Sequence, residues 1–309
     1  MIVEVEHLTK EFRRGKRETF TAVDRVGFSI APGERVAFIG PNGAGKSTTL
    51  KMLTGILYPT SGSARVAGLV PWQERRRLAH EIGIVFGQRS QLWYHLKVED
   101  SFELLGRVYG LRPADYRARA AEVAAILRIE ALLSQRVKTL SLGQRMRCEI
   151  AAALLHRPRI LFLDEPTIGL DVTAKALLRE HLKHVAEADD TAIVLTSHDT
   201  GDIEEICSRV ILVNHGRVLL DQPLDALRAA FVARKRITLV TEEQDPQCCF
   251  ADADVILAAP HKLVLSVDGA RGAVDRVVSQ ALARYDVRDL TIENAPLEAI
   301  IRDLYGGAA

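Results

Sequence analysis

A glycine-rich segment that ends in a lysine and a serine is the first place where the sequence predicts chemistry. Its residues are Gly40, Pro41, Asn42, Gly43, Ala44, Gly45, Lys46, Ser47 and the adjoining Thr48. They fit the spacing G-x-x-x-x-G-K-[ST], in which backbone N–H groups turn inward on the phosphates of a nucleotide. Glycines allow this turn because side chains would obstruct it. Lys46 then offers charge to the outer phosphates, and Ser47 offers a hydroxyl to Mg²⁺.

Two carboxylates form a second chemical group, at the end of a predicted strand. Asp164 and Glu165 directly follow the apolar segment 160–163. Open α/β sheets bind their ligands at the carboxyl ends of the strands, so both acids are expected at the ligand crevice. There Asp164 can hold Mg²⁺ through water, and Glu165 can orient or deprotonate the attacking water. Two surface acids that cap a strand are the alternative interpretation, and the phosphate loop weighs against it.

The elements that must position these groups alternate between strands and helices. Short apolar segments are typical of buried strands in a parallel sheet, and longer segments with a 3.6-residue period are typical of helices. The predicted strands are 35–39, 84–86, 160–163 and 192–195, and the predicted helices are 47–53, 144–155 and 174–188. Alanine-, leucine- and arginine-rich periodicity predicts a helical insertion at about 89–157. The pattern therefore predicts an α/β fold.

The length of 309 residues favours two domains, because single cores stop growing at roughly 250 residues. We place the boundary near Pro223, with a nucleotide-binding domain at 1–222 and a small α+β accessory domain at 223–309. The second domain is expected to contain strands at 237–240, 263–267 and 287–292, and helices at 273–283 and 296–304. It contains no pattern of catalytic residues, so we interpret it as a dimer-stabilising or regulatory appendage.

Charge and hydropathy limit the classes of partner. The net charge of +1 gives no reason to expect nucleic acid. No segment approaches the roughly 20 apolar residues of a membrane helix, and the acidic N-terminus is unlike a signal peptide, so we expect a cytoplasmic protein. The four cysteines show neither a disulfide framework nor metal-binding spacing, and we interpret them as reduced packing residues.

The segment Leu140-Ser141-Leu142-Gly143-Gln144 resembles the L-S-G-G-Q signature of the ATP-binding subunits of ABC transporters. The resemblance covers roughly residues 3–221 and implies a P-loop NTPase core with an antiparallel β subdomain and a helical subdomain. Other elements of that family follow in the expected order, namely Gln88 after the strand 84–86, the turn Gly169-Leu170-Asp171, and His198. Narrower features, including the form Ser141-Leu142-Gly143-Gln144-Arg145-Met146, resemble an export-associated, viologen-exporter-like subgroup.

The resemblance also implies a site shared by two copies arranged head to tail, with ATP between the phosphate loop of one copy and the signature of the other. Ser141 and the N–H of Gly143 would form a second anion-binding helix terminus there, with Gln144 beside them. Gln88 would sense Mg²⁺ and water and link to the membrane subunits. His198 would contact the outermost phosphate, Asp171 would contact the second copy, and Phe12 would stack on adenine. Ordinary packing or surface roles are the alternatives for Phe12, Gln88 and His198.

These features together predict an ATPase on the cytoplasmic face of the membrane that drives a separate permease. A soluble relative acting on ribosomes or DNA is an alternative, but the sequence shows neither a second nucleotide domain nor sustained heptads. A non-catalytic regulator is a third possibility, because Leu142 stands where the family has glycine and a side chain there could crowd the triphosphate. Glu165 and His198 argue against that reading, since a degenerate site is expected to lose its catalytic carboxylate first.

Overall fold

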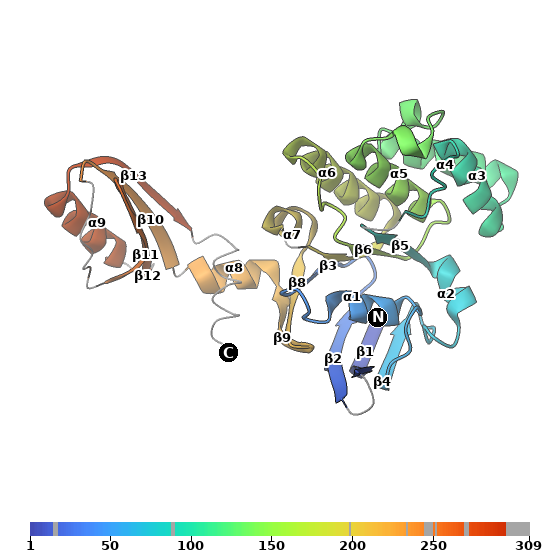
Figure 1. The fold of residues 1–309 in the computed structure, drawn as a ribbon, viewed down its shortest axis with the longest axis horizontal. Coiled ribbons are helices and arrows are strands. Elements are labelled where there is room, and N and C mark those ends of the chain that lie inside the picture. The colour runs from blue at the N-terminus through green and yellow to red at the C-terminus, as the bar shows by residue number, and fades with distance from the viewer. Residues whose placement is uncertain are drawn as a thin grey trace. The chain divides into compact units, whose positions relative to one another are not determined.

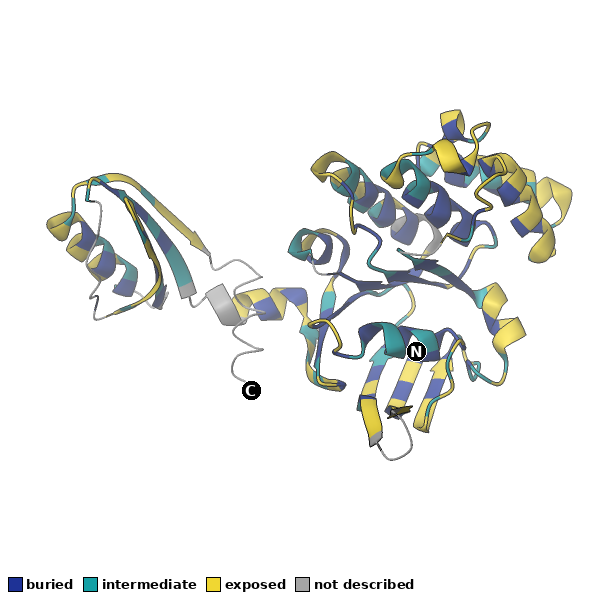
Figure 2. Cartoon of the chain, viewed as in Figure 1, coloured by how far each residue is buried: buried dark blue, intermediate teal, exposed yellow. Residues whose placement is uncertain are grey.

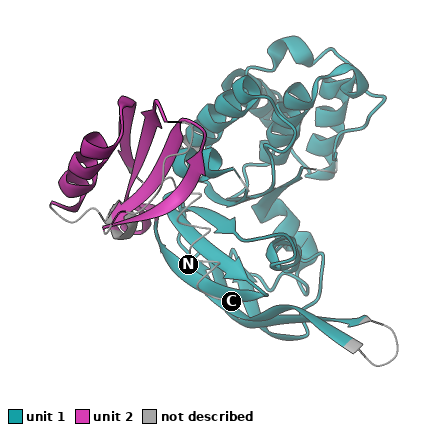
Figure 3. Ribbon diagram, turned by 60° about the vertical axis from the view of Figure 1, so that its left-hand side comes forward, with its two compact units in different colours: residues 1–223 teal, residues 224–309 magenta. Residues whose placement is uncertain are grey.

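The computed structural model describes residues 1–14, 18–87, 90–197, 199–232, 234–243, 250, 252–268 and 272–294. The chain divides into two compact units, Met1–Pro223 and Leu224–Ala309, coloured separately in Figure 3. Each unit has its own cluster of buried apolar side chains. None of the described helices is both long and apolar enough to cross a membrane.

A six-stranded sheet runs through the middle of the first unit, in the order β5-β6-β7-β3-β8-β9. Its first five strands are parallel, and β9 returns antiparallel to β8 after a tight turn in which His215 and Gly216 both have positive φ. The strands are β3 (Arg35–Ile39), β5 (Ile82–Phe86), β6 (Ile160–Asp164), β7 (Ala192–Thr196), β8 (Arg209–Asn214) and β9 (Arg217–Pro223). The apolar segments are buried because both faces of this sheet are covered (Figure 2).

A three-stranded antiparallel sheet and helix α1 cover one face of the central sheet (Figure 1). The elements are β1 (Val3–Arg14), β2 (Glu18–Ile30), β4 (Ser61–Val66) and α1 (Lys46–Leu53). Val3, Ile30, Leu50 and Phe38 belong to the buried cluster that joins these layers. This antiparallel part confirms the β subdomain that the resemblance implies.

Helices α5 (Leu142–Leu154), α6 (Val172–Asp189) and α7 (Thr200–Ile206) cover the opposite face (Figure 1). Helices α3 (Val98–Val108) and α4 (Pro113–Ile126) pack against α5, and Pro113 starts α4 at a position where a missing N–H costs nothing. Short 3₁₀ turns at Glu130–Leu132 and Val137–Thr139 lead from α4 to α5, and α2 (Arg75–Glu81) precedes β5. Together these elements confirm an α/β phosphate-loop fold with a helical subdomain.

The second unit is built on a separate antiparallel sheet in the order β11-β12-β10-β13. It contains α8 (Leu224–Val232), β10 (Arg234–Thr241), β11 (Ala253–Ala259), β12 (Lys262–Asp268), α9 (Ala273–Arg284) and β13 (Val287–Asn294). Val277 and Ala281 on α9 share a buried cluster with Ile237 and Leu265 of the sheet. One helix over an antiparallel sheet is an α+β arrangement. The helix predicted at 296–304 lies outside the described residues.

Candidate nucleotide-binding site

The phosphate loop connects the end of β3 with the start of α1, and two of its glycines lie against neighbouring backbone. A Cβ added to Gly40 would lie 2.4 Å from the carbonyl oxygen of Val213, and one added to Gly45 would lie 2.4 Å from that of Ala22. Gly45 also has φ 101°, which side chains disfavour. Strands β2 and β8 therefore hold the loop from two sides and leave no room for larger residues at these positions.

Lys46 lies inside this loop and is only 6% exposed. Its ammonium group donates to the carbonyl oxygens of Gly40 at 2.6 Å and Pro41 at 3.1 Å. Burial lowers the pKa of Lys46, while the charges of Glu165 and Asp164 act in the opposite direction. The lysine is thus held at the loop, with the two carboxylates near enough to influence its charge.

Ser47 and Asp164 are in direct contact, although 117 positions separate them in the chain. The Ser47 hydroxyl donates to Asp164 Oδ1 at 3.1 Å, and the Thr196 hydroxyl donates to the same oxygen at 2.7 Å. These groups come from the start of α1 and from the carboxyl ends of β6 and β7, which adjoin in the sheet. Sequence reasoning missed Thr196, although its place directly after the apolar segment 192–195 could have indicated it.

Glu165 follows Asp164 in a backbone conformation that is uncommon for a residue with a side chain. Its φ is 54°, and its N–H donates to the hydroxyl and the carbonyl oxygen of Thr196 at 3.0 and 3.1 Å. Gly87 packs against this turn, since its N–H donates to Asp164 O at 2.9 Å and an added Cβ would lie 2.5 Å from Glu165 O. Gln88, the next residue, lies outside the described residues.

A buried carboxylate, Asp202, ties together the segments that follow β6 and β7. It accepts hydrogen bonds from the hydroxyls of Thr167 and Ser197, and from the guanidinium of Arg179 at 2.7 Å. Asp202 is 0% exposed and was not predicted, because no motif marks an acid inside α7. Since Thr167 lies two positions after Glu165 and Ser197 directly follows Thr196, the cluster fixes the chain just after both of these residues.

Asp199 extends this cluster toward the surface. Lys175 donates to its carboxylate at 2.6 Å and Arg179 at 2.9 Å. Burial works against ionisation, but the hydrogen bond from Lys175 and the charges of Arg179 and Lys175 together lower the pKa of Asp199. Ser197 and Asp199 flank His198, which itself lies outside the described residues.

Ser141 caps helix α5, which begins at Leu142, earlier than the predicted start at 144. The Ser141 hydroxyl accepts from the N–H of Gln144 at 3.2 Å, and the Gln144 side chain accepts from the N–H of Ser141 at 2.9 Å. This reciprocal capping box explains the earlier start. The N–H groups of Leu142 and Gly143 precede the first intrahelical bond, from Arg145 N to Ser141 O at 2.8 Å. We call Ser141, Leu142, Gly143 and Gln144 the signature corner.

The turn that precedes α6 lies directly against the signature corner. A Cβ added to Gly169 would lie 3.0 Å from Leu142 Cδ2, so the Leu142 side chain covers that glycine. Likewise, a Cβ added to Gly143 would lie 3.0 Å from the Cβ of Ala174. Asp171 caps α6 by accepting from the N–H of Ala174 at 2.8 Å. The structure therefore brings Asp171 and the signature corner together on one surface.

Phe12 lies on β1 opposite Phe20 of β2, with 39% of its surface exposed. The Lys10 ammonium is 5.2 Å from the centre of its ring. This exposure argues against the alternative in which Phe12 is a core residue.

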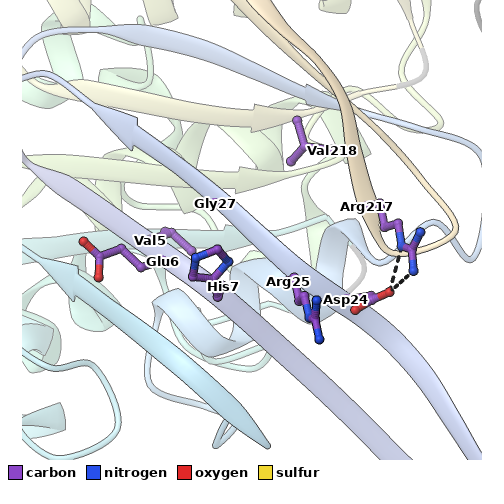
Figure 4. Close-up of a pocket in the computed structure, with 8 residues that line it drawn as sticks. All are labelled: Val5, Glu6, His7, Asp24, Arg25, Gly27, Arg217 and Val218. Carbon is purple, nitrogen blue, oxygen red and sulfur yellow. Dashed lines mark hydrogen bonds and ion pairs between the residues drawn. The ribbon is translucent and has the colours of Figure 1, made fainter.

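A hollow of about 940 Å³ lies elsewhere in the first unit, beside β1, β2 and β9 (Figure 4). Arg217 and Asp24 form an ion pair at 2.6 Å in its wall, which also contains Glu6, His7 and Arg25. None of the predicted site residues lines it.

Parallel strands that deliver a phosphate loop and an acidic pair to one edge of the sheet define the class of phosphate-loop nucleotide hydrolases. Residues 23–168 match the family model described as ABC transporter. The linearmycin resistance ATP-binding protein LnrL of Bacillus subtilis is 29% identical over 313 residues, covering 99% of this chain and 98% of that protein. The Nod factor export ATP-binding protein I of Paraburkholderia xenovorans is 37% identical over 211 residues, covering 68% of each chain.

A solved structure gives the same assignment. The dimeric ATP-binding cassette MJ0796, in a post-hydrolysis state with ADP and Pi, is 29% identical with a TM-score of 0.65, and the match covers 72% of this chain and 98% of that one. The chain belongs to the ABC transporter family, as an ATP-binding subunit that hydrolyses ATP.

Proposed function

We propose that two copies of this chain bind two ATP molecules between them, head to tail, and that ATP-driven closing and hydrolysis-driven opening power export through a separate membrane permease. The observation that carries this proposal is the cluster of Ser47, Asp164 and Thr196 beside Lys46, because it assembles phosphate, metal and water ligands at one sheet edge. ATP acts in this cycle as a ligand with higher affinity for the closed state.

Lys46 and the loop amides bind the triphosphate in this proposal. The lysine now donates to the carbonyl oxygens of Gly40 and Pro41, and phosphate oxygens would replace them as acceptors. The N-terminus of α1 contributes a further partial positive charge to the same phosphates. Backbone N–H groups of residues 42–48 supply the remaining donors, since Pro41 has none.

The hydroxyl of Ser47 and the carboxylate of Asp164 fit Mg²⁺, since both are hard oxygen ligands in mutual contact. No group of three or more His, Cys, Asp or Glu side chains that could hold a metal occurs in the described part of the chain. This agrees with a nucleotide-bound Mg²⁺, which needs only one or two protein ligands. Bound there, the ion would neutralise phosphate charge. We expect Gln88 to be a further ligand.

Glu165 orients or deprotonates the attacking water in this mechanism. The two hydrogen bonds from its N–H to Thr196 fix the backbone from which the carboxylate extends. Phosphoryl transfer needs such positioning more than covalent help. His198 would contact the outermost phosphate. The hydrogen bonds from Ser197 and Thr167 to Asp202 would hold the chain next to His198 and Glu165 in place.

The second copy completes the site through its signature corner. A hydroxyl that accepts one hydrogen bond can still donate its own hydrogen, so the capped Ser141 can bind a phosphate oxygen. The N–H of Gly143 and the dipole of α5 favour the same anion. Asp171 would contact the second copy, and Phe12 would stack on adenine in its own copy.

The permease is expected to dock near the segment that follows Gln88. Trp93 and Tyr94 are 41% and 56% exposed, while Leu92 is buried. Large exposed aromatic residues are typical of protein interfaces. Export is favoured because one relative carries export in its name. The subunit would then lie peripherally on the cytoplasmic face of the membrane, without contact to nucleic acid.

Replacement of Glu165 by Gln tests this mechanism. We expect ATP hydrolysis to fall by about 100-fold or more, the usual contribution of a positioned general base, while ATP-dependent dimers accumulate in size-exclusion chromatography. The matched control is Glu130→Gln, an exposed carboxylate in a 3₁₀ turn, which should keep both properties. Unchanged hydrolysis in Glu165→Gln would contradict the mechanism. Co-purification of ribosomes or DNA instead of membrane subunits would contradict the transport role.

A further inference from the structure

Glu149 is a buried carboxylate in the middle of α5, and the mechanism above does not use it. It is 4% exposed and lies two helical turns beyond Ser141. The Ser90 hydroxyl donates to its Oε1, and the N–H of Gln91 donates to its Oε2 at 3.0 Å. The Gln91 side chain also donates to the backbone oxygen of Glu149 at 2.8 Å. One helical residue thus holds the segment that begins directly after Gln88 and Arg89.

Packing alone does not account for an acid at this position. Burial raises the pKa of Glu149, and the hydrogen bonds from Ser90 and Gln91 only partly offset that effect. The neighbouring residues Cys148 and Ile150 are buried and apolar, and an apolar side chain would avoid the desolvation cost. Buried polar groups of this kind restrict a structure to one arrangement when all their partners are present.

The same segment is attached to the signature corner at a second place. The carbonyl oxygens of Tyr94 and Leu96 accept from the N–H groups of Lys138 and Val137, both at 3.0 Å. Residues 137–139 form the 3₁₀ turn that leads directly into Leu140 and Ser141. Residues 90–96 are therefore fastened to α5 at Glu149 and to the chain just before the signature corner.

We propose that Glu149 is a positioning residue that makes residues 90–92 and the signature corner move as one body. In the head-to-tail dimer on which this inference rests, Gln88 belongs to the ATP site of its own copy, whereas Ser141 contacts the ATP held by the partner. A rigid connection between residues 90–92, which follow Gln88 and Arg89 in the sequence, and the signature corner transmits the state of one ATP site to the other. Because Trp93 and Tyr94 belong to the fastened segment 90–96, the same connection carries the movement to the exposed aromatic surface.

Variants at position 149 separate this coupling from simple packing. Glu149→Leu removes both side-chain acceptors and keeps a similar volume. Glu149→Gln retains the geometry, because its amide oxygen can accept from Gln91 N–H and its amide N–H can donate to Ser90 Oγ. We measure, on the full chain, ATP affinity at low protein concentration, the steady-state rate, and the Hill coefficient of hydrolysis against ATP.

For Glu149→Leu we expect the ATP affinity of the separated subunit to be unchanged. We expect kcat to fall by about fivefold or more and the Hill coefficient to be near one, since coupling between sites typically changes affinities by about 5–150-fold. Glu149→Gln should keep the properties of the natural protein. The inference would be overturned if Glu149→Leu had the same kcat and Hill coefficient as the natural protein. It would also be overturned if weaker ATP binding fully explained the fall in kcat. If Glu149→Leu does not fold, the double variant Ser90→Ala, Gln91→Ala replaces it, with the same expected and contradicting results.

The Glu165→Gln background distinguishes failure of this inference from failure of the proposed function. If Glu165→Gln alone forms no ATP-dependent dimer, the shared site is wrong. If it forms dimers and Glu149→Leu leaves kcat and cooperativity unchanged, only the role of Glu149 is wrong.

Discussion

The phosphate loop and the signature corner are both helix starts to which we assign the phosphates of ATP, but they differ in how much of the chain supports them. Lys46 is buried, and β2 and β8 close on the loop so tightly that Gly40 and Gly45 cannot carry a side chain. Ser141 and Leu142 are exposed, and the capping box pairs only the N–H groups of Ser141 and Gln144. In the proposed dimer, the loop would therefore bind ATP within one copy, whereas the corner would become a site only against the second copy.

The largest effect that this comparison predicts is at Lys46. Replacement by Ala removes a buried charge that no neighbouring group can substitute, and charge-assisted hydrogen bonds contribute about 1.5–3 kcal/mol each. We expect ATP affinity to fall by about 100-fold, measured by titration of a fluorescent ATP analogue on separated subunits. Lys51→Ala, on the same helix, is the control and should bind normally. Near-normal binding by Lys46→Ala would mean that the loop is not the primary site.

At Ser141 we expect a smaller effect, and one that appears only when two copies meet. Ser141→Ala removes the cap of α5, which costs about 1 kcal/mol of stability, and the hydroxyl offered to the partner's ATP. ATP binding by separated subunits should be unchanged, while kcat and ATP-dependent dimer formation fall by about tenfold. Ser141→Thr retains the hydroxyl and should restore both. Weaker ATP binding in the separated Ser141→Ala subunit would contradict the view that the phosphate loop binds ATP within one copy and the signature corner only in a pair.

The sequence predicted the parts of this site that depend on local spacing. The bounds of β3 and the presence of β5, β6 and β7 follow from short apolar segments, and the contact between Ser47 and Asp164 agrees with the expectation that strand ends meet at one edge. Strand β8 was missed although residues 210–213 are as apolar as the other buried strands, and β9 was missed because polar residues bound and interrupt its apolar residues. Strand β4 was missed because it begins inside a cluster of turn residues.

The supporting residues could not be predicted for a different reason. Asp202 and Glu149 act through partners that lie 35 and 59 positions away in sequence, so no spacing rule connects them with the groups they hold. Glu149 stands among apolar neighbours on α5, and Asp202 stands close to the acids Glu204 and Glu205 on α7, so in neither place does a sequence pattern give the acid a particular meaning. Only the packing of α5 and α7 against the ends of the strands shows what these carboxylates do.

Leu142 offers the finest test of the comparison, because a side chain on the exposed corner could obstruct the partner's triphosphate. In the structure its side chain lies over Gly169, and Ser141 is exposed. Leu142→Ala shortens the side chain and keeps helix propensity, so kcat should change by less than about threefold, a difference below 1 kcal/mol. Leu142→Gly additionally loosens the helix start at a cost of about 1 kcal/mol, which should appear as a lower melting temperature.

The two variants separate obstruction from support at this position. If Leu142 covered the phosphate site, both would raise kcat and strengthen the ATP-dependent dimer, and Gly would do so more than Ala. If Leu142 instead braces the turn before α6, both would leave ATP binding by separated subunits intact, and both would lose stability, the glycine variant more than the alanine variant. A rise in kcat of about tenfold in Leu142→Ala would therefore show that the Leu142 side chain restricts the access of phosphate to the signature corner. The two regions would then differ in how easily phosphate reaches them as well as in how much of the chain supports them.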